Sequence, residues 1–454
     1  MPLSAPAAPR STAPPLRLIT PDHPDYDVAR SAWNLAVDQR PAAVCVATSV
    51  EEVQAAIAHA RAHGLRVAAQ TTGHLSQTLP SLEEALLLKL ALHDADVAVD
   101  PVARTARIKA GARWGDVVDA VAPHGLAAMH GSSPSVGVIG YLLGGGLSFY
   151  GRRHGLAVNH VRAFEVVTPD GIARRADPHH NADLFYALRG GGGGYAIVTA
   201  VELGLLPYAE VTGGALFFAA SDARRLLCAW RDWTNDAPDS ITTTFRLLRL
   251  PPLPDVPEPL RGVPTVCVDG VALEAGEAIL LEQRLRAVAT PILGGFDAMP
   301  SAAVVRLHGD PEEPVPAAGD GMLLERLDNG AIDAFLRVAA RPSSPLIAAE
   351  LRHLGGALAV PPPGAGARGH LEGRFMLFGV GGVGMPAPEA DLHAYLDGYL
   401  GALLPWATGT RFLSLAERTS SLRTCVPDAA LARLVRARAA LDPDGLLVAS
   451  HLPS

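Results

Sequence analysis

Residues 131–156 of this 454-residue chain are unusually rich in glycine. Seven glycines stand at positions 131, 137, 140, 144, 145, 146 and 151, and an eighth follows at 155. Glycine lets the backbone adopt positive φ and approach a ligand closely, because no Cβ is in the way. Such a loop can point backbone N–H groups at a phosphate. Glycine pairs are also common in tight turns, so this stretch alone leaves both interpretations open.

Two other segments favour a cofactor over a set of turns. The first, residues 69–76, places a histidine, His74, directly after a glycine in a polar turn. A lone histidine is more commonly a surface or hydrogen-bonded residue, although an exposed imidazole can act as base, ligand or nucleophile. The second is Asp183–Arg189, which is followed by five consecutive glycines, residues 190–194. Each of the three loops follows an apolar run, and this order favours a cofactor site.

Together these segments resemble the FAD-linked oxidases of the vanillyl-alcohol-oxidase superfamily, most closely the berberine-bridge-enzyme-like branch. The resemblance extends from about Arg40 to Pro207 and recurs at 441–451. In that family a Thr-Gly-His or Gly-Gly-His pattern carries the histidine that is bonded covalently to the flavin, which corresponds to Gly73-His74 here. The family's glycine-rich run corresponds to residues 131–156. The resemblance implies FAD as the cofactor, attached through His74.

The same resemblance implies which other residues contact FAD. Most lie in the His74 loop and the glycine-rich run, two lie near the adenine end of FAD and one near the C-terminus. The full set beside His74 is Gln70, Thr71, Thr72, Gly73, Leu75, Ser76, Gly131, Ser132, Ser133, Val136, Gly137, Gly140, Tyr141, Gly145, Gly146, Leu147, Gly155, Asn159, Ile197, Val198 and Ser450.

The sequence departs from the family pattern at several of these positions. Ser133 stands where many members have a second flavin-linking cysteine, so we expect a single covalent bond. Gln70 replaces a residue that is often basic and therefore brings no charge. Ser414 and Ser450 stand where asparagine is usual. Val136 occupies a position at which fast oxygen-reacting members usually have valine, and this favours an oxidase.

The chemistry that the resemblance implies is removal of a hydride from an alcohol, hemiacetal or amine carbon of a small molecule by FAD. A base assists, and O2 then reoxidises the flavin to give H2O2. Candidate catalytic residues are Glu350, Arg352 and His353 in an expected strand, where the first two share one face and His353 takes the other. A solvated strand face or an internal ion pair would produce the same pattern. Tyr141 and Tyr150 are weaker candidates that fit packing roles better.

The predicted fold is α+β, with a two-part FAD-binding domain and a substrate domain of antiparallel sheet backed by helices. We expect a tail and lead-in over 1–36, the FAD-binding domain over 37–208, the substrate domain over 209–410, and a segment returning to the first domain over 411–454. Residues 43–69 read as strand, helix and strand, with Ser49 and Glu52 forming a capping-box signature. Residues 163–175 read as a hairpin around a Pro-Asp-Gly turn. Residues 221–233 read as a helix capped by Ser221.

A loose dinucleotide fingerprint at residues 191–196 does not fit a Rossmann fold. Rossmann glycines follow a strand and open a helix. Here a helix-like segment, 182–188, precedes them and a β-branched, strand-like segment, 196–203, follows.

Composition limits the remaining function classes. The chain is 49% apolar with a net charge of −8, and it has no cluster of Lys and Arg, so we expect a globular protein that does not bind nucleic acid. The sequence contains no run of 18 apolar residues, so we expect no membrane span. The Pro- and Ala-rich N-terminus resembles a disordered tail and lacks the apolar core of a signal peptide. Four cysteines without CxxC spacing indicate reduced thiols of a cytoplasmic protein, with neither zinc nor disulfides.

Only two lysines occur, Lys89 and Lys109, and both lie in apolar or strand-like runs, which argues against Schiff-base chemistry. The high Arg, Ala and Pro content is typical of a GC-rich bacterium, where relatives often modify secondary metabolites. Two other functions stay open: a flavin enzyme that performs a cyclisation or rearrangement, including a redox-neutral one, and a flavin-binding protein without turnover. The sequence predicts neither the substrate nor the oligomeric state.

Overall fold

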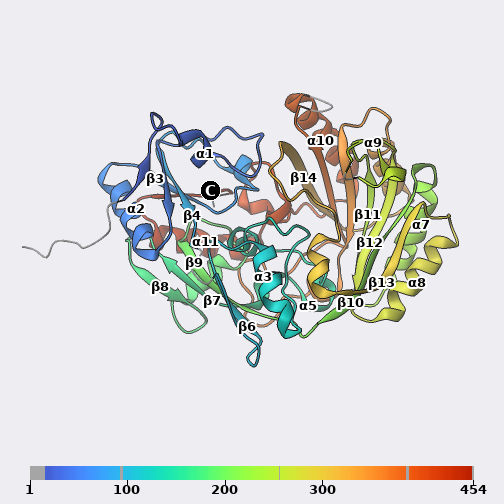
Figure 1. Ribbon diagram of the computed structural model, residues 1–454, viewed down its shortest axis with the longest axis horizontal. Helices are drawn as coiled ribbons and strands as arrows, with labels where there is room; N and C mark the ends of the chain where they lie inside the picture. The colour runs from blue at the N-terminus through green and yellow to red at the C-terminus, as the bar shows by residue number, and fades with distance from the viewer. Residues whose placement is uncertain (1–15, 93–95, 255, 385–387, 452–454) are drawn as a thin grey trace, which may run out of the picture.

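The computed structural model describes residues 16–92, 96–254, 256–384 and 388–451. The expected disordered tail over residues 1–15 lies outside them. Figure 1 shows two bodies side by side: one holds the N-terminal strands with helices α2 and α11, and the other a broad sheet with α7, α8 and α9 on its outer face. The fold is α+β, as the sequence predicts.

The first body contains two five-stranded sheets. The first sheet has the order β1-β2-β4-β3-β17, in which β2, β4, β3 and β17 are parallel. Its strands are β1 Leu18–Ile19, β2 Ala43–Ala47, β4 Ala85–Leu90, β3 Arg66–Gln70 and β17 Leu447–Val448. The second sheet is antiparallel, with the order β5-β6-β9-β7-β8. Its strands are β5 Val97–Asp100, β6 Thr105–Lys109, β9 Ile197–Gly204, β7 Val161–Val167 and β8 Ala173–Ala176.

Helix α2 (Val50–Ala62) confirms the strand–helix–strand prediction. The Ser49 hydroxyl accepts a hydrogen bond from the Glu52 backbone N–H at 3.2 Å and caps the helix. The helix buries Val53 and Ile57, each contributing about 1.5–3 kcal/mol by leaving water. It connects β2 to β3, although β4 lies between those strands in the sheet. The predicted hairpin is also present, as β7 and β8.

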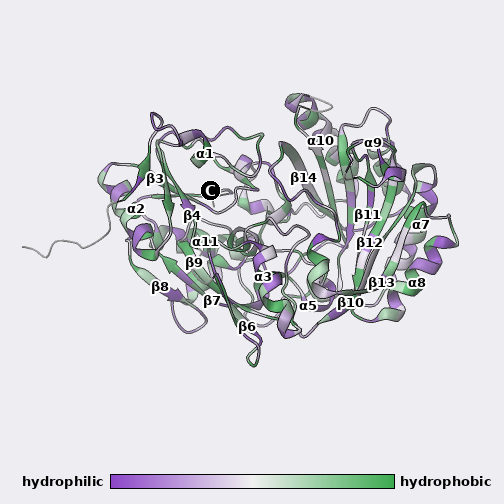
Figure 2. Cartoon of the chain, in the orientation of Figure 1, coloured by the Kyte–Doolittle hydropathy of each residue, from purple (hydrophilic) through white to green (hydrophobic). Residues whose placement is uncertain are grey.

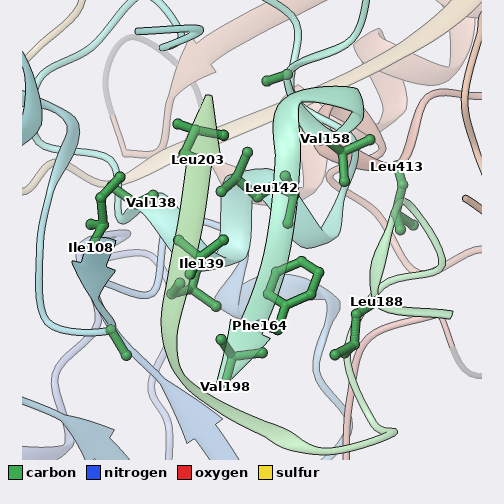
Figure 3. Close-up of a cluster of buried hydrophobic side chains, with 14 of the residues drawn as sticks. Ile108, Val138, Ile139, Leu142, Val158, Phe164, Leu188, Val198, Leu203 and Leu413 are labelled. Atoms are coloured by element: carbon green, nitrogen blue, oxygen red, sulfur yellow. The ribbon is translucent and has the colours of Figure 1, made fainter. Parts of the chain in front are cut away.

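Short helices cover the second sheet and connect it to the first. In Figure 3, Ile139 and Leu142 of α4 pack beside Val198 and Leu203 of β9 and near Phe164 of β7. All of these side chains are buried. The helices of the first body are α1 Tyr26–Arg30, α3 Trp114–Val121, α4 Val138–Leu143, α5 Gly151–His154, α6 Ala182–Leu188 and α11 Asp428–Leu441.

The second body is a seven-stranded antiparallel sheet with the order β13-β10-β12-β11-β15-β16-β14. Its strands are β10 Glu210–Ala219, β11 Ile241–Leu248, β12 Thr265–Ala272, β13 Leu293–Pro300, β14 Ala317–Leu324, β15 Leu346–His353 and β16 Phe375–Gly382. Its helices are α7 Ala223–Thr234, α8 Ala275–Arg286, α9 Asn329–Ala339 and α10 Glu389–Leu403. Apolar side chains of the sheet and helices form a second core. In Figure 2, helices α7 and α8 carry both green and purple segments, because only one part of each helix packs on the sheet.

The cap predicted for α7 is wrong. Ser221 lies inside a 3-10 turn, Ala220–Asp222, and the helix begins at Ala223 after Asp222. Neither residue makes a side-chain hydrogen bond that caps the helix. Because of this turn the helix begins after the serine. The helix itself is present as predicted, but its first residue is not the predicted one.

The C-terminal segment returns to the first body. Strand β17 pairs in parallel with β3, with Leu447 opposite Val67. Asp442 fixes this return, because its carboxylate accepts hydrogen bonds from the backbone N–H groups of Leu446 at 2.8 Å and Leu447 at 2.9 Å. Strand β9 of the first body ends at Gly204 and strand β10 of the second body begins at Glu210, so residue 208 lies in the connection between them. In the part of the chain that the structure describes, no helix has both the length and the apolar character that crossing a bilayer requires.

Candidate active site

His74 lies in the loop that leaves the end of β3. Gly73 turns the chain with a φ of 85°, a value that glycine adopts readily. The imidazole stacks on the Trp33 ring, with centroids 4.1 Å apart and planes 15° from parallel. Its Nδ1 is 2.8 Å from the Thr72 hydroxyl, and its Nε2 is 3.4 Å from the Ser135 hydroxyl. The ring is therefore held in one orientation.

The imidazole of His74 is neutral in the folded protein. Burial, together with the nearby Arg113 cation, lowers its pKa to about 3. A neutral imidazole keeps a lone pair on one ring nitrogen. That is the form that can bond covalently to a flavin, so the site suits the linkage that the sequence predicts.

Residues 131–136 lie directly beside His74. Ser133 is buried, and its hydroxyl is 2.9 Å from that of Ser135, which in turn contacts His74. Ser132 donates a hydrogen bond to Asp310 of the second body at 2.6 Å. Val136 is half-buried in the same segment. The start of the glycine-rich run therefore connects the His74 loop to the second body.

The triple glycine has a packing role that the sequence interpretation missed. A Cβ on Gly144 would lie 2.5 Å from the Ser414 hydroxyl, and a Cβ on Gly146 would lie 2.3 Å from the Tyr141 ring. The backbone N–H of Gly146 also donates to Ser414 at 3.3 Å, and Gly145 has a φ of 109°. These glycines are thus needed to keep this fold, so their presence does not by itself argue against a non-catalytic protein.

The remaining residues expected to contact FAD fall into two groups. Around the loops, Gly131 and Gly137 are tightly packed, and a Cβ on Gly137 would lie 3.2 Å from Thr71. Gln70 and Leu147 are buried, whereas Leu75 and Ser450 are half-buried and Gly140 is exposed. At the other end, the side chains of Ile197 and Val198 are buried. The backbones of Ile197 and Val198 pair with β7 on one side. They do not pair with β6 on the other side, because the pairing between β9 and β6 begins only at Ala200.

Buried polar atoms show that these residues fit a large polar cofactor. The Ser76 hydroxyl, the Tyr141 hydroxyl and the Asn159 side-chain oxygen are buried and have no hydrogen-bond partner among the residues that the structure describes. Buried polar groups in native proteins are nearly always hydrogen-bonded. Asn159 uses its nitrogen to bond the Gly369 carbonyl at 2.8 Å, beside Gly155, which has a φ of 82°. FAD offers donors and acceptors along its length, so these orphaned atoms suit it.

A second group of functional side chains lies on one face of the seven-stranded sheet. Strand register places Arg246 of β11 opposite Glu350 of β15, and Thr244 opposite both Arg352 and Asp269 of β12. Residues two apart on a strand point to the same face. Glu350 and Arg352 therefore share a face, as the alternation predicts.

His308 joins these strands into a buried charge cluster of Arg246, Asp269, His308, Glu350 and Arg352. The imidazole Nδ1 is 2.9 Å from the Asp269 carboxylate, and its Nε2 is 3.1 Å from the Glu350 carboxylate. Arg352 Nε donates to the other oxygen of Glu350 at 2.7 Å, and Arg246 pairs with Asp269. Each member is less than a tenth exposed.

Mutual pairing sets the charge states within the cluster. Burial and Arg246 lower the pKa of His308, but Asp269, Asp310 and Glu350 outweigh them and raise it to about 9. Burial raises the pKa of Glu350, but Arg352 and His308 outweigh burial and hold it far below its usual range. At neutral pH the histidine is an imidazolium that donates from both nitrogens, and Glu350 is a carboxylate. Strongly perturbed groups brought together in this way are typical of functional sites.

The charge cluster borders the glycine-rich run. The Arg352 guanidinium lies 5.6 Å from the centre of the Phe149 ring, and that ring is 5.9 Å from the His308 ring. The Ser132–Asp310 hydrogen bond lies close by in sequence, two residues beyond His308. Arg352 also lowers the pKa of the Tyr141 phenol, although burial raises it by more. The expected catalytic pair therefore lies at the boundary between the two bodies, next to the residues assigned to FAD.

His353 lies on the opposite face of β15. Its ring contacts Trp230 and Trp233 of α7 and Phe375 of β16, and its Nε2 accepts a hydrogen bond from Arg152 at 2.9 Å. The structure therefore does not bring it together with Glu350 and Arg352. Tyr150 stacks on Tyr208, with ring centroids 6.0 Å apart, which fits the packing role that the sequence favours.

Sequence reasoning missed three members of the charge cluster. Arg246 and Asp269 are lone charges in otherwise apolar or β-branched strands, a signal that could have identified them. His308 follows a 3-10 turn, Ser301–Arg306, in a segment without a recognisable pattern. Only the fold brings it beside Glu350.

Comparisons with known proteins point to an FAD-binding domain within the first body. The FAD binding domain family matches residues 41–177. The chain is 30% identical over 227 residues to (R)-6-hydroxynicotine oxidase of Paenarthrobacter nicotinovorans, covering 49% of each chain. It is 36% identical over 193 residues to glucooligosaccharide oxidase of Sarocladium strictum, covering 42% of this chain and 38% of the relative. The aligned regions span about half the length of these relatives or less.

Solved structures resemble the chain over nearly its whole length. Physcomitrella patens BBE-like 1 superposes with a TM-score of 0.83 at 20% identity, covering 97% of this chain and 96% of the other. The 6-hydroxy-D-nicotine oxidase of Arthrobacter nicotinovorans gives 0.81 at 20% identity, covering 95% and 96%. The fold is thus the two-domain fold of these structures. Residues 41–177 match the FAD binding domain family, and the relatives aligned over part of the chain are oxidases, in agreement with the resemblance seen in the sequence.

Proposed function

We propose that this protein is an FAD-dependent oxidase that converts an alcohol, hemiacetal or amine carbon of a small molecule to the carbonyl or imine level. His74 would hold FAD covalently, and the bound FAD would supply the hydride acceptor and be reoxidised by O2, so that substrate and O2 would give oxidised product and H2O2. The observation that carries the proposal is the charge cluster at the boundary with the glycine-rich run. The oxidase names of relatives aligned over part of the chain support it.

Within this proposal, Glu350 accepts the proton that leaves the substrate hydroxyl or amine. It is ionised at neutral pH, so it needs no prior deprotonation. His308 and Arg352 hold one carboxylate oxygen each, which fixes its orientation. Asp269 orients His308 in turn, through Nδ1.

The test replaces Glu350 with glutamine, which keeps its shape and removes its charge. With a panel of sugars, alcohols and cyclic amines, the wild-type protein should release H2O2 in step with O2 consumption. Glu350→Gln should lower kcat by about 10²–10⁴-fold, the usual contribution of a general base. Its flavin spectrum should be unchanged, because the residues assigned to FAD are untouched.

The matched control is Glu325→Gln, at a solvent-exposed glutamate that pairs only with Arg326 in the part of the chain described. It should keep wild-type kcat. If Glu350→Gln turned over as fast as the control on a substrate of the wild type, Glu350 would not be the base. If the flavin of the wild type were reduced anaerobically by a substrate but not reoxidised by O2, the protein would be a dehydrogenase, against this proposal.

A further inference from the structure

A cleft of about 220 Å³ lies beside the His74 loop. It is lined by Thr71 and Thr72 of that loop, by Lys89 at the end of β4, and by Gly111 and Arg113 before α3. Thr72 is also the hydrogen-bond partner of His74. Sites for whole small ligands usually measure about 300–1,000 Å³, so this cleft suits one part of a larger molecule.

The cleft carries two positively charged side chains, Lys89 and Arg113. Lys89 Nζ donates at 2.7 Å to the Ser31 carbonyl and at 2.7 Å to the Gln70 side-chain oxygen. An ammonium has three donors, so one is left over. Among the described residues, no carboxylate pairs with Lys89 or Arg113. Burial alone lowers the pKa of Lys89 to about 8. A partly buried ammonium is unfavourable without an anion to pair with.

The position of Lys89 also resolves an apparent gap in the sequence. Gln70 ends strand β3 directly before the His74 loop, and it brings no charge of its own. The ammonium of Lys89 reaches the Gln70 side chain from the neighbouring strand, because register places Gln70 opposite Lys89. A positive charge therefore lies 2.7 Å from the side-chain oxygen of the uncharged Gln70.

We propose that Lys89 and Arg113 bind the diphosphate of FAD in this cleft, with Lys89 replacing the charge that Gln70 lacks. The proposal rests on the proposed function, since it takes FAD as the cofactor. Thr71, Thr72 and Gly111 line the same cleft, but the Thr71 hydroxyl donates to the Ala110 carbonyl at 3.1 Å and the Thr72 hydroxyl pairs with His74, so the positive charges of Lys89 and Arg113 carry the proposal. Lys89 acts in binding and takes no part in the chemistry at the substrate.

The test measures flavin binding without turnover. In a His74→Ala background the flavin is not covalently held, so flavin-free protein can be titrated with FAD and, separately, with riboflavin, which lacks phosphate. Lys89→Met, of similar length, should weaken FAD binding about 10- to 100-fold, as expected for losing a hydrogen bond between charged groups. Riboflavin binding should be unchanged. Arg113→Met should act in the same direction.

Lys109→Met is the matched control, because Lys109 is the other lysine of the chain, lies in strand β6 and does not line the cleft. It should leave both affinities unchanged. Equal loss of FAD and riboflavin affinity in Lys89→Met would make Lys89 a structural support and overturn the proposal. Unchanged FAD affinity would overturn it as well. If the His74→Ala parent bound neither flavin, FAD itself would be the wrong cofactor.

A second measurement separates a folding defect from a binding defect. Lys89→Met leaves the Ser31 carbonyl and the Gln70 side-chain oxygen without this donor, so the melting temperature of the flavin-free variant should be only slightly below that of its parent. If that variant did not fold, the His74→Ala parent alone would still test whether the protein binds the diphosphate. The parent should bind ADP at least tenfold more tightly than adenosine, and its affinity for ADP should fall as salt increases. Equal binding of ADP and adenosine would overturn the proposal.

Discussion

His308 makes the stability of the protein depend on pH. Its pKa is raised from 6.5 to about 9 in the folded state, so the folded protein binds a proton there more tightly than the unfolded chain does. The resulting stabilisation is complete below pH 6.5 and is lost as pH rises to about 9. Melting temperature should therefore fall over this range in the wild type, and His308→Gln should flatten the fall. An equal fall in both proteins would show that His308 is not protonated in the cluster.

At the residue scale, sequence could identify a histidine or a strand pair but not the partners that set their charge. His74, Glu350 and Arg352 stand in recognisable local patterns. The raised pKa of His308 depends on Asp269 and Glu350, which are 39 and 42 residues away from it in the sequence. Only the fold brings these two carboxylates beside the imidazole. The apolar run around Lys89 gives no sign of a binding role in the sequence. Only the structure shows that its ammonium contacts the Gln70 side chain.

Helix α2 offers a direct test of how sequence patterns translate into elements. Ser49→Ala removes the hydroxyl that accepts from Glu52, and should lower the free energy of unfolding by about 1 kcal/mol. Ser221→Ala, at a serine that resembles a cap in sequence but lies inside a 3-10 turn, should change it by less than about 0.5 kcal/mol. Urea denaturation of both variants measures the difference. Equal losses would contradict the assignment of only Ser49 as a cap.

Elements with strong local signals were predictable, and their order within sheets was not. The strand–helix–strand unit, the β7–β8 hairpin and strand β15 follow from capping, turn and alternation patterns. The insertion of β4 between β2 and β3 depends on packing between distant segments. The contact of Gly144 and Gly146 with Ser414 is likewise a tertiary effect, and it gives the triple glycine a role that a local pattern cannot reveal.

At the scale of the whole molecule, the site depends on three separated parts of the chain. The first body supplies His74 and the glycine-rich run, the second supplies the charge cluster, and the C-terminal segment packs against the triple glycine through Ser414 before β17 joins β3. The Ser132–Asp310 hydrogen bond links the first two parts directly. This arrangement explains why the fold and cofactor class could be predicted from ordered motifs, whereas the substrate could not.

Acid precipitation of the purified protein, followed by the absorbance spectrum of pellet and supernatant, tests the proposed flavin linkage most directly in the wild type and His74→Ala. Yellow flavin should stay with the wild-type pellet and be released from the variant. If the wild type were yellow but released all its flavin, His74 would not be a covalent link. A wild-type protein that held no flavin at all would contradict the assignment of this chain as an FAD-dependent enzyme.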